Sequence, residues 1–235
     1  MPDSGDPDDS KSDNSEALCF DMYGTLCDTS TVTTALGEHL DVADGFVADV
    51  DAVWRRTQLR YAQQVALMEE YRPFWEVTER ALDYALNFYD LEPSERAREE
   101  IIAAYEDLDP YPDAADALAD LGDSHTVVVL SNGNPEMLAT LAENAGLADL
   151  LDDIVSAHEV RTFKPDPAVY RNAADRLDRE LGECRLVSSN PWDVAGAASA
   201  GMATAWVNRS REPAEEVGGE ADLTVESLSV LAEVL

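Results

Sequence analysis

The sequence predicts an α/β fold built on a doubly wound parallel sheet, and three observations support this prediction. Short apolar runs that stop at turn or cap residues recur along the chain, as expected for strands buried on both faces. Helical patterns separate three of these runs. A long helical stretch after the first run predicts a helical cap inserted into this Rossmann-like core. The predicted strands are 17–21 (ALCFD), 126–131 (TVVVLS), 184–189 (CRLVSS) and 203–208 (ATAWVN).

The segments between these strands carry apolar residues at helical spacing together with helix start and stop residues. NPEMLATLAENAGL at 134–147 contains a glycine stop, and DPAVYRNAADRLDREL at 166–181 opens with Asp-Pro, a favoured helix start. The stretch after the first strand is too long for a simple crossover. The expected parts of the chain are an acidic disordered tail (1–15), a core (16–29 and 113–235) and a helical cap (30–112).

The chain is strongly acidic, with 49 Asp and Glu against 16 Lys and Arg and a formal net charge of -33. Nucleic acids and anionic membrane surfaces need a positive face, so neither is an expected partner. Hydrophobic residues still make up 45% of the chain, which argues against a disordered acidic polymer. A globular core under a carboxylated surface resembles proteins of salt-loving microbes, where salt screens self-repulsion.

The three cysteines, Cys19, Cys27 and Cys184, are odd in number, and two of them lie in strand-like apolar runs. They indicate reduced core residues in a cytoplasmic protein. The N-terminal segment has neither a basic start nor an apolar stretch, so no signal peptide is expected, and no segment is apolar enough for a membrane helix. The three histidines are scattered without metal-ligand spacing.

Polar residues gather where the predicted strands stop, which is where sites form in open α/β sheets. Each has an ordinary explanation alone: an aspartate after a strand often forms a turn, Ser-Asn-Gly is a common turn, and Asp193 suits the first turn of a helix. Their order along the chain is hard to obtain by chance. These residues are Asp21, Gly24, Thr25, Ser131, Asn132, Gly133, Lys164, Ser188, Asn190 and Asp193.

Together these positions resemble the four motifs of the haloacid dehalogenase superfamily. Phosphatases of that superfamily carry a second aspartate two residues after the nucleophile, which protonates the leaving alkoxide. Here Tyr23 stands two residues after Asp21. A halide is a very weak base and leaves unprotonated, so the tyrosine favours carbon–halogen cleavage. The fourth motif, SSNPWD, offers one carboxylate where Mg²⁺ would gather several oxygen ligands, and we expect neither a metal nor another cofactor.

Longer segments resemble the L-2-haloacid dehalogenases over nearly everything except the acidic tail. The resemblance implies a hydrolase that converts short L-2-haloalkanoic acids to D-2-hydroxyalkanoic acids through an aspartyl ester. Its partner would be a small halogenated carboxylic acid, and a homodimer is possible. A metal-dependent phosphatase of the same superfamily is the alternative. The segments are FDMYGTL, WRRTQL, YRPFWEVTERAL, LSNG, FKPDPAVY and VSSNPWDVAGAASAGMATAWVNR.

For the first chemical step, the resemblance implies that Asp21 attacks the carbon bearing the halogen. Lys164 would favour the charged form of Asp21 and help to bind the substrate carboxylate, together with Ser131 and backbone N–H groups after Asp21, beginning at Met22. Arg55 would receive the halide with Asn132 as its partner. Arg56 is the rival of Arg55 for this role.

For the second step, the resemblance implies that Asp193, with Ser188 and Asn190, orients and deprotonates a water. Thr25 and Tyr170 complete the polar set, although Thr25 also suits a capped turn and Tyr170 a helix covering the sheet. The implied apolar pocket consists of Tyr23, Leu59, Phe74 and Trp192, for which core packing at helical spacing is the alternative.

The sequence departs from the usual pattern of these enzymes at Cys27, Phe163 and Pro191, and none of the departures removes a catalytic group. Pro191 is expected to affect the position of Trp192 and so the preferred substrate. Two other classes are less favoured: a receiver-type phosphoacceptor domain leaves no room for the cap, and an idle binding protein would not need every polar position filled with a competent residue.

Overall fold

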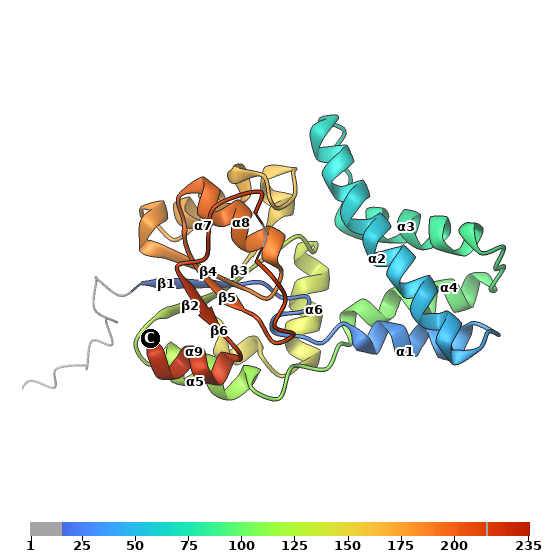
Figure 1. Cartoon of the computed structure of the whole chain (residues 1–235), viewed down its shortest axis with the longest axis horizontal. Helices are drawn as coiled ribbons and strands as arrows, with labels where there is room; N and C mark the ends of the chain where they lie inside the picture. Colours follow the sequence, from blue (N-terminus) through green and yellow to red (C-terminus); the bar gives the residue numbers. More distant parts are fainter. Residues whose placement is uncertain (1–15, 215) are drawn as a thin grey trace, which may run out of the picture.

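The computed structural model describes residues 16–214 and 216–235, so the predicted acidic tail at 1–15 lies outside the described residues. The core is a parallel six-stranded sheet in the order β3-β2-β1-β4-β5-β6, with helices on both faces (Figure 1). This arrangement confirms the predicted doubly wound α/β fold. The strands are β1 (Ala17–Phe20), β2 (Thr126–Ser131), β3 (Asp153–Ser156), β4 (Cys184–Ser188), β5 (Ala203–Val207) and β6 (Leu223–Val225).

The four predicted strands are present, each within one residue of its expected bounds, and two edge strands were missed. Strand β3 pairs with β2 alone, and β6 pairs with β5 alone. The first two residues of both edge strands are partly or fully exposed. A strand with one neighbour and one open side needs no continuous apolar run, so the pattern that revealed the central strands is absent there.

Alternating side chains of the sheet divide its packing into two layers. Leu18 and Phe20 face the layer formed with α5 (Ala114–Gly122), α6 (Pro135–Asn144) and α9 (Leu228–Val234). Ala17 and Cys19 face the opposite layer, formed with α7 (Pro167–Arg176) and α8 (Pro191–Ala200). Figure 1 shows α7 and α8 on one side of the sheet and α5 and α9 on the other. Single 3₁₀ turns span Ala104–Glu106, Ala148–Leu150, Ala157–Val160 and Leu181–Glu183.

Four helices lie between β1 and α5 and stand beside the sheet in Figure 1. They are α1 (Ser30–His39), α2 (Asp44–Leu67), α3 (Phe74–Phe88) and α4 (Glu95–Ala103). Buried residues of these helices, such as Trp54 and Leu82, belong to the same hydrophobic cluster as Leu18 of the sheet. The continuous apolar contact positions the helices over the carboxyl ends of the strands. No helix in the described ranges is both long and apolar enough to cross a membrane.

Candidate active site

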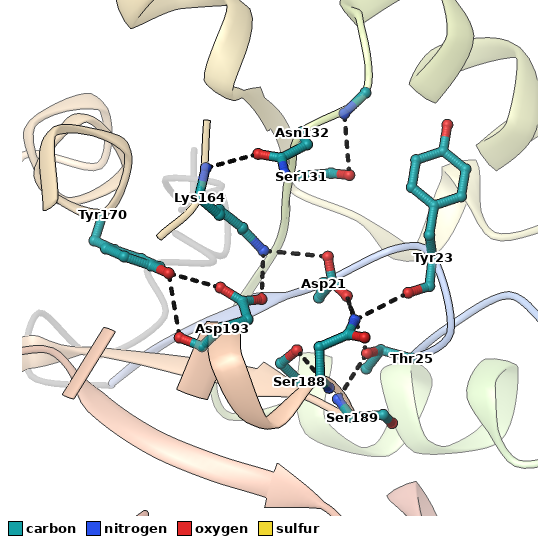
Figure 2. A network of polar contacts seen from close by, with 12 residues as sticks. Asp21, Tyr23, Thr25, Ser131, Asn132, Lys164, Tyr170, Ser188, Ser189 and Asp193 are labelled. Carbon is teal, nitrogen blue, oxygen red and sulfur yellow. Dashed lines mark hydrogen bonds and ion pairs between the residues drawn. The ribbon is translucent and has the colours of Figure 1, made fainter. Parts of the chain in front are cut away.

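The carboxyl ends of β1, β2 and β4 bring the polar residues of the candidate site together (Figure 2). Asp21 directly follows β1, Ser131 is the last residue of β2, and Ser188 is the last residue of β4. Asp193 lies in the first turn of α8, which begins at Pro191. Proline is favoured at this helix position because its missing N–H would have no partner there. The parallel sheet therefore gathers side chains that are up to 172 positions apart in the numbering from Asp21 to Asp193.

The Lys164 ammonium lies between two buried carboxylates. Its Nζ atom is 3.1 Å from Asp21 Oδ1 and 2.8 Å from Asp193 Oδ2. The lysine side chain is 1% exposed, against 8% for Asp21 and 0% for Asp193. The hydroxyl of Tyr170 donates to the other Asp193 oxygen at 2.8 Å. These contacts form a continuous chain from Asp21 to Tyr170 (Figure 2).

The second oxygen of Asp21 is held by neutral donors. The amide of Asn190 donates from Nδ2 to Asp21 Oδ2 at 2.7 Å and to the Tyr23 carbonyl at 3.2 Å. The Thr25 hydroxyl donates to Asp21 Oδ2 at 3.3 Å and accepts the peptide N–H of Ser189 at 2.8 Å. Donors on both oxygens fix the orientation of the Asp21 carboxylate, as a nucleophile requires.

Burial and charge act in opposite directions on Asp21. Burial raises the pKa of Asp21 above its ordinary value, and Asp193 adds to this, whereas Lys164 and the Asn190 amide lower it. For Lys164, burial lowers the pKa, but the two carboxylates outweigh it and the net shift is upward. The pKa of Tyr170 is raised by burial and by the charge of Asp193. Lys164 is thus held in its charged form and Tyr170 in its neutral form at ordinary pH.

Two further predicted residues anchor the opposite side of the site. Asn132 accepts the peptide N–H of Lys164 through Oδ1 at 2.8 Å, which positions the loop that carries the lysine. The Ser131 hydroxyl accepts the Gly133 peptide N–H at 3.3 Å. Gly133 is in close contact with its surroundings, because a Cβ there would stand 2.8 Å from a methyl carbon of Leu138 and 3.1 Å from the Tyr23 hydroxyl.

A cavity of about 210 Å³ lies over Asp21, between the strand ends and helices α2 and α3. A volume of this size suits a small organic acid rather than a large metabolite. Ten of the residues named in the sequence analysis line it. The lining residues are Asp21, Tyr23, Gly24, Thr29, Arg55, Gln58, Leu59, Phe74, Tyr105, Ser131, Asn132, Asn190 and Trp192.

The geometry favours Arg55 over Arg56 as the cationic residue of the cavity. Arg55 is half-buried and lines the cavity, whereas Arg56 is exposed. The guanidinium Nε atom of Arg55 is 2.8 Å from both carboxylate oxygens of Asp51. Its Nη2 atom donates to the Thr29 carbonyl. These contacts direct the arginine from α2 toward the core.

Aromatic rings form the wall around Tyr23. Its ring stacks on Phe74 with centroids 6.4 Å apart and meets Tyr105 edge-on at 5.7 Å. Within the described chain, the buried hydroxyl oxygen of Tyr23 has no hydrogen-bond partner. Burial is the main cause that raises the pKa of Tyr23, so this residue is a neutral phenol in the site. It is therefore a poor candidate for a group that must cycle its proton.

Three residues expected to contact the substrate are not among those that line the cavity: Met22, for which the expectation concerned the backbone N–H, and Lys164 and Tyr170. The Met22 side chain is fully buried in the hydrophobic core, and Tyr170 lies behind Asp193 with no exposed surface. Lys164 Nζ instead contacts Asp21 and Asp193, and the Tyr170 hydroxyl contacts Asp193, so both side chains lie against the two carboxylates. Thr25, Ser188 and Asp193 also lie outside the cavity lining, around the nucleophile.

Three lining residues were missed by the sequence analysis: Thr29, Gln58 and Tyr105. Gln58 was within reach of sequence reasoning, because it lies three residues after Arg55 and so on the same face of a helix. Thr29 accepts from Arg55 through its carbonyl, a contact that no side-chain pattern reveals. Tyr105 comes from a single 3₁₀ turn far along the chain and reaches the site only through packing.

The described residues give the site two neighbouring carboxylates, Asp21 and Asp193, as possible ligands of a divalent cation. In the ranges that the structure describes, no group of three His, Cys, Asp or Glu side chains lies close enough to hold a metal. The two carboxylates nearest each other, Asp21 and Asp193, already share the ammonium of Lys164. A Mg²⁺ ion prefers several oxygen ligands, whereas here the Lys164 ammonium contacts the oxygens of both carboxylates.

Residues 16–201 match the haloacid dehalogenase-like hydrolase family. The chain belongs to this family, in the branch formed by the L-2-haloacid dehalogenases, also called (S)-2-haloacid dehalogenases. It is 38% identical over 220 residues to (S)-2-haloacid dehalogenase 1 of Pseudomonas sp. (strain CBS-3), covering 93% of this chain and 96% of that protein. It is 40% identical over 199 residues to the (S)-2-haloacid dehalogenase of Xanthobacter autotrophicus, covering 85% and 77%.

Solved structures agree with this relationship. The L-2-haloacid dehalogenase of Xanthobacter autotrophicus superimposes with a TM-score of 0.88 and 35% identity, covering 94% of this chain and 98% of that one. The same enzyme with chloropropionic acid covalently bound gives a TM-score of 0.84 and 34% identity over the same shares. The enzyme class predicted from Tyr23 and the cap segments is thereby confirmed.

Proposed function

We propose that this enzyme hydrolyses the carbon–halogen bond of short L-2-haloalkanoic acids and releases D-2-hydroxyalkanoic acids. One observation carries the proposal: a buried aspartate with both oxygens oriented lies under a small cavity that has aromatic rings in its wall and also holds an arginine. The position two residues after the aspartate is a tyrosine, which suits a leaving group that needs no proton. The (S)-2-haloacid dehalogenases that resemble this chain support the same reaction.

In the first step, a carboxylate oxygen of Asp21 attacks the carbon that bears the halogen. A carbon–oxygen bond forms, the carbon–halogen bond breaks, and the halide leaves with the bonding electrons while the configuration inverts. Arg55 supplies positive charge for the departing halide, with Asn132 on the core side. Asp51 keeps the guanidinium in place through Nε.

The substrate carboxylate is proposed to bind near Ser131 and the backbone N–H groups of the turn after Asp21. Gly24 forms this turn with φ +83°, a conformation that favours glycine. Lys164 is assigned a different task, because its ammonium is enclosed between Asp21 and Asp193. It stabilises the charged carboxylate of Asp21, and substrate recognition is left to the residues that line the cavity.

In the second step, a water oxygen attacks the carbonyl carbon of the Asp21 ester. The bond between that carbon and the substrate oxygen breaks, the hydroxy acid leaves with a proton, and the Asp21 carboxylate is restored. Asp193 is the proposed base, and Lys164 and Tyr170 orient its two oxygens. Ser188 and Asn190 are linked by a hydrogen bond of 3.1 Å and support the loop beside the ester.

Halide release from each enantiomer of 2-chloropropionate, with a metal chelator present, tests the proposal. We expect release from the L form alone, production of D-lactate, and loss of both in Asp21→Asn. Asp123→Asn, which changes an exposed aspartate, is the matched control and should behave as the unaltered enzyme. Absence of halide release together with chelator-sensitive cleavage of phosphate esters would contradict the proposal and favour a phosphatase.

Three properties of the whole molecule are part of the proposal. A homodimer is supported by apolar side chains exposed at the end of α2 and on α3, including Leu67, Trp75 and Phe88. A cytoplasmic location is supported by the three free and buried cysteines. Adaptation to high salt is supported by the formal net charge of -33.

A further inference from the structure

A second, smaller cavity of about 80 Å³ lies next to the turn that follows Asp21. Gly24 lines both this cavity and the larger one over the nucleophile. The other lining residues come from the loops after β4 and β5 and from Tyr111. The proposed mechanism above assigns nothing to this cavity.

Two buried polar atoms of the lining residues have no hydrogen-bond partner in the part of the chain that the structure describes: Ser189 Oγ and Arg209 Nε. The guanidinium of Arg209 is held in place, because Nη1 and Nη2 each lie 2.9 Å from an oxygen of Asp113. Its Cζ atom also stands 4.2 Å from the centre of the Tyr111 ring. Arg209 therefore cannot turn to satisfy Nε without losing these contacts, and buried polar groups are costly when unpaired.

The chemistry of the lining residues selects water as the ligand. A guanidinium N–H and a hydroxyl offer donors and an acceptor, which suit a molecule that both donates and accepts. A water takes roughly 30 Å³ in the liquid, so this cavity has room for about two. The paired Asp113 neutralises Arg209, and Glu212 also lines the cavity, so a free anion is disfavoured. The guanidinium disfavours a metal cation.

The cavity is connected to the nucleophile through Thr25. The peptide N–H of Ser189 donates to the Thr25 hydroxyl, which donates to Asp21 Oδ2. The Nη2 atom of Arg209 donates to the Thr25 carbonyl at 3.4 Å. Gly24 has no side chain to separate the two cavities, and apart from Gly24 and its two chain neighbours no described atom lies within 4 Å of the place where its Cβ would stand.

We propose that this cavity holds ordered water and supplies the water that hydrolyses the Asp21 ester, an inference that rests on the proposed function. Once the ester forms, the substrate esterified to Asp21 occupies part of the cavity above it, and the smaller cavity gives water a second approach. The cavity beside Gly24 offers a polar approach from the loops after β4 and β5, where the lining residues Ser210 and Glu212 are exposed. The water oxygen then joins the carbonyl carbon of Asp21 and the ester bond to the substrate oxygen breaks. One proton of the water goes to the leaving hydroxy acid and the other to Asp193, the proposed base, and the next water enters the cavity.

Single-turnover kinetics with Ser189→Val, which fills the cavity, tests the proposal. Halide release in the first turnover should stay within about twofold of the unaltered enzyme, whereas hydroxy acid formation should slow about tenfold. The ester-bearing protein should then accumulate, as seen by intact-mass measurement. Ser189→Ala, which leaves the space open, should slow the second step less. Ser124→Val, on the exposed loop at the opposite end of the sheet, is the matched control.

Equal effects of Ser189→Val on both steps, or no effect on either, would overturn the proposal while leaving dehalogenation by the unaltered enzyme intact. No halide release by the unaltered enzyme would instead overturn the proposed function. A high-resolution crystal structure of the unaltered protein provides a test that does not depend on the variant folding. We expect density for a water bonded to Ser189 Oγ and Arg209 Nε. A dry cavity, or an anomalous peak there after growth in bromide, would overturn the assignment.

Discussion

The Asp51 carboxylate and the Arg55 guanidinium form an ion pair one helical turn apart on α2, with Nε 2.8 Å from each carboxylate oxygen. The Thr33 hydroxyl donates to the same carboxylate at 2.9 Å. Asp51 therefore acts on the site indirectly, by directing the arginine over the strand ends. The neighbouring Arg56 has the same charge but points to solvent.

Arg55→Ala is expected to lower the rate of halide release at least about 100-fold, because it removes the positive charge that the leaving halide meets. Arg56→Ala should change this rate less than about twofold, since an exposed side chain contributes little. Initial rates of chloride release from L-2-chloropropionate measure both. Equal losses in the two variants would show that general surface charge, rather than the geometry of Arg55, is responsible.

Tyr23→Phe is expected to raise the thermal unfolding temperature while halide release continues. The buried hydroxyl of Tyr23 lacks a partner in the described residues, and such a group costs roughly 1–3 kcal/mol of stability. Tyr105→Phe is the comparison, because the Tyr105 hydroxyl has the Gln58 side chain as a partner and its removal should lower the unfolding temperature. Complete loss of halide release in Tyr23→Phe would mean that the phenol takes part in the chemistry.

The acid side of the pH–rate profile should reflect the nucleophile. Burial raises the pKa of Asp21, so its carboxylate becomes protonated sooner as the pH is lowered. The first-turnover rate should therefore begin to fall while the pH is still above about 4, the ordinary pKa of aspartate. Asn190→Ala removes a donor to the charged carboxylate and should move this limb to still higher pH. Asn87→Ala, on the exposed face of α3, should leave the acid limb of the profile at its original pH. A limb that moves equally in both variants would argue against Asp21 as the titrating group.

The same shift has a consequence for stability. Because the folded protein binds the Asp21 proton more tightly than the unfolded chain, this group contributes stability below its ordinary pKa. That contribution is lost as the pH rises through the raised value. Lys164 is a base, and its raised pKa means that the folded protein also holds the lysine proton more tightly than the unfolded chain. The stability that this group contributes therefore persists at neutral pH and is lost only at strongly alkaline pH. Unfolding of Lys164→Met, measured from neutral to alkaline pH, should show the largest deficit at neutral pH.

Salt is expected to increase both activity and unfolding temperature. With 49 acidic against 16 basic residues, self-repulsion of the surface is strong at low ionic strength, and roughly 1 M salt shortens the Debye length to about 3 Å. Thermal unfolding across a KCl series measures the effect. Sorbitol at matched osmolality is the control for water activity. A flat KCl profile would contradict the interpretation of the composition as an adaptation to salt.

The strand ends show how much of the site could be predicted from the sequence. Asp21, Ser131 and Ser188 each close an apolar run, and parallel strands bring their carboxyl ends to one edge of the sheet. The alternation of strands and helices was therefore enough to predict that these residues meet. The edge strands β3 and β6 escaped notice because the first two residues of each are partly or fully exposed and neither forms a continuous apolar run.

What the sequence determined by itself was the order of the elements, the candidate nucleophile Asp21 and the lack of an aspartate at position 23. These depend on local periodicity and on the chemistry of single residues. Only the tertiary structure decided that Lys164 contacts both Asp21 and Asp193, that Arg55 rather than Arg56 faces the cavity, and that Tyr105 joins its wall. The physical reason is that such placements depend on how the helices between β1 and α5 pack against the sheet. That packing is set by contacts between residues far apart in the chain, which periodicity does not record.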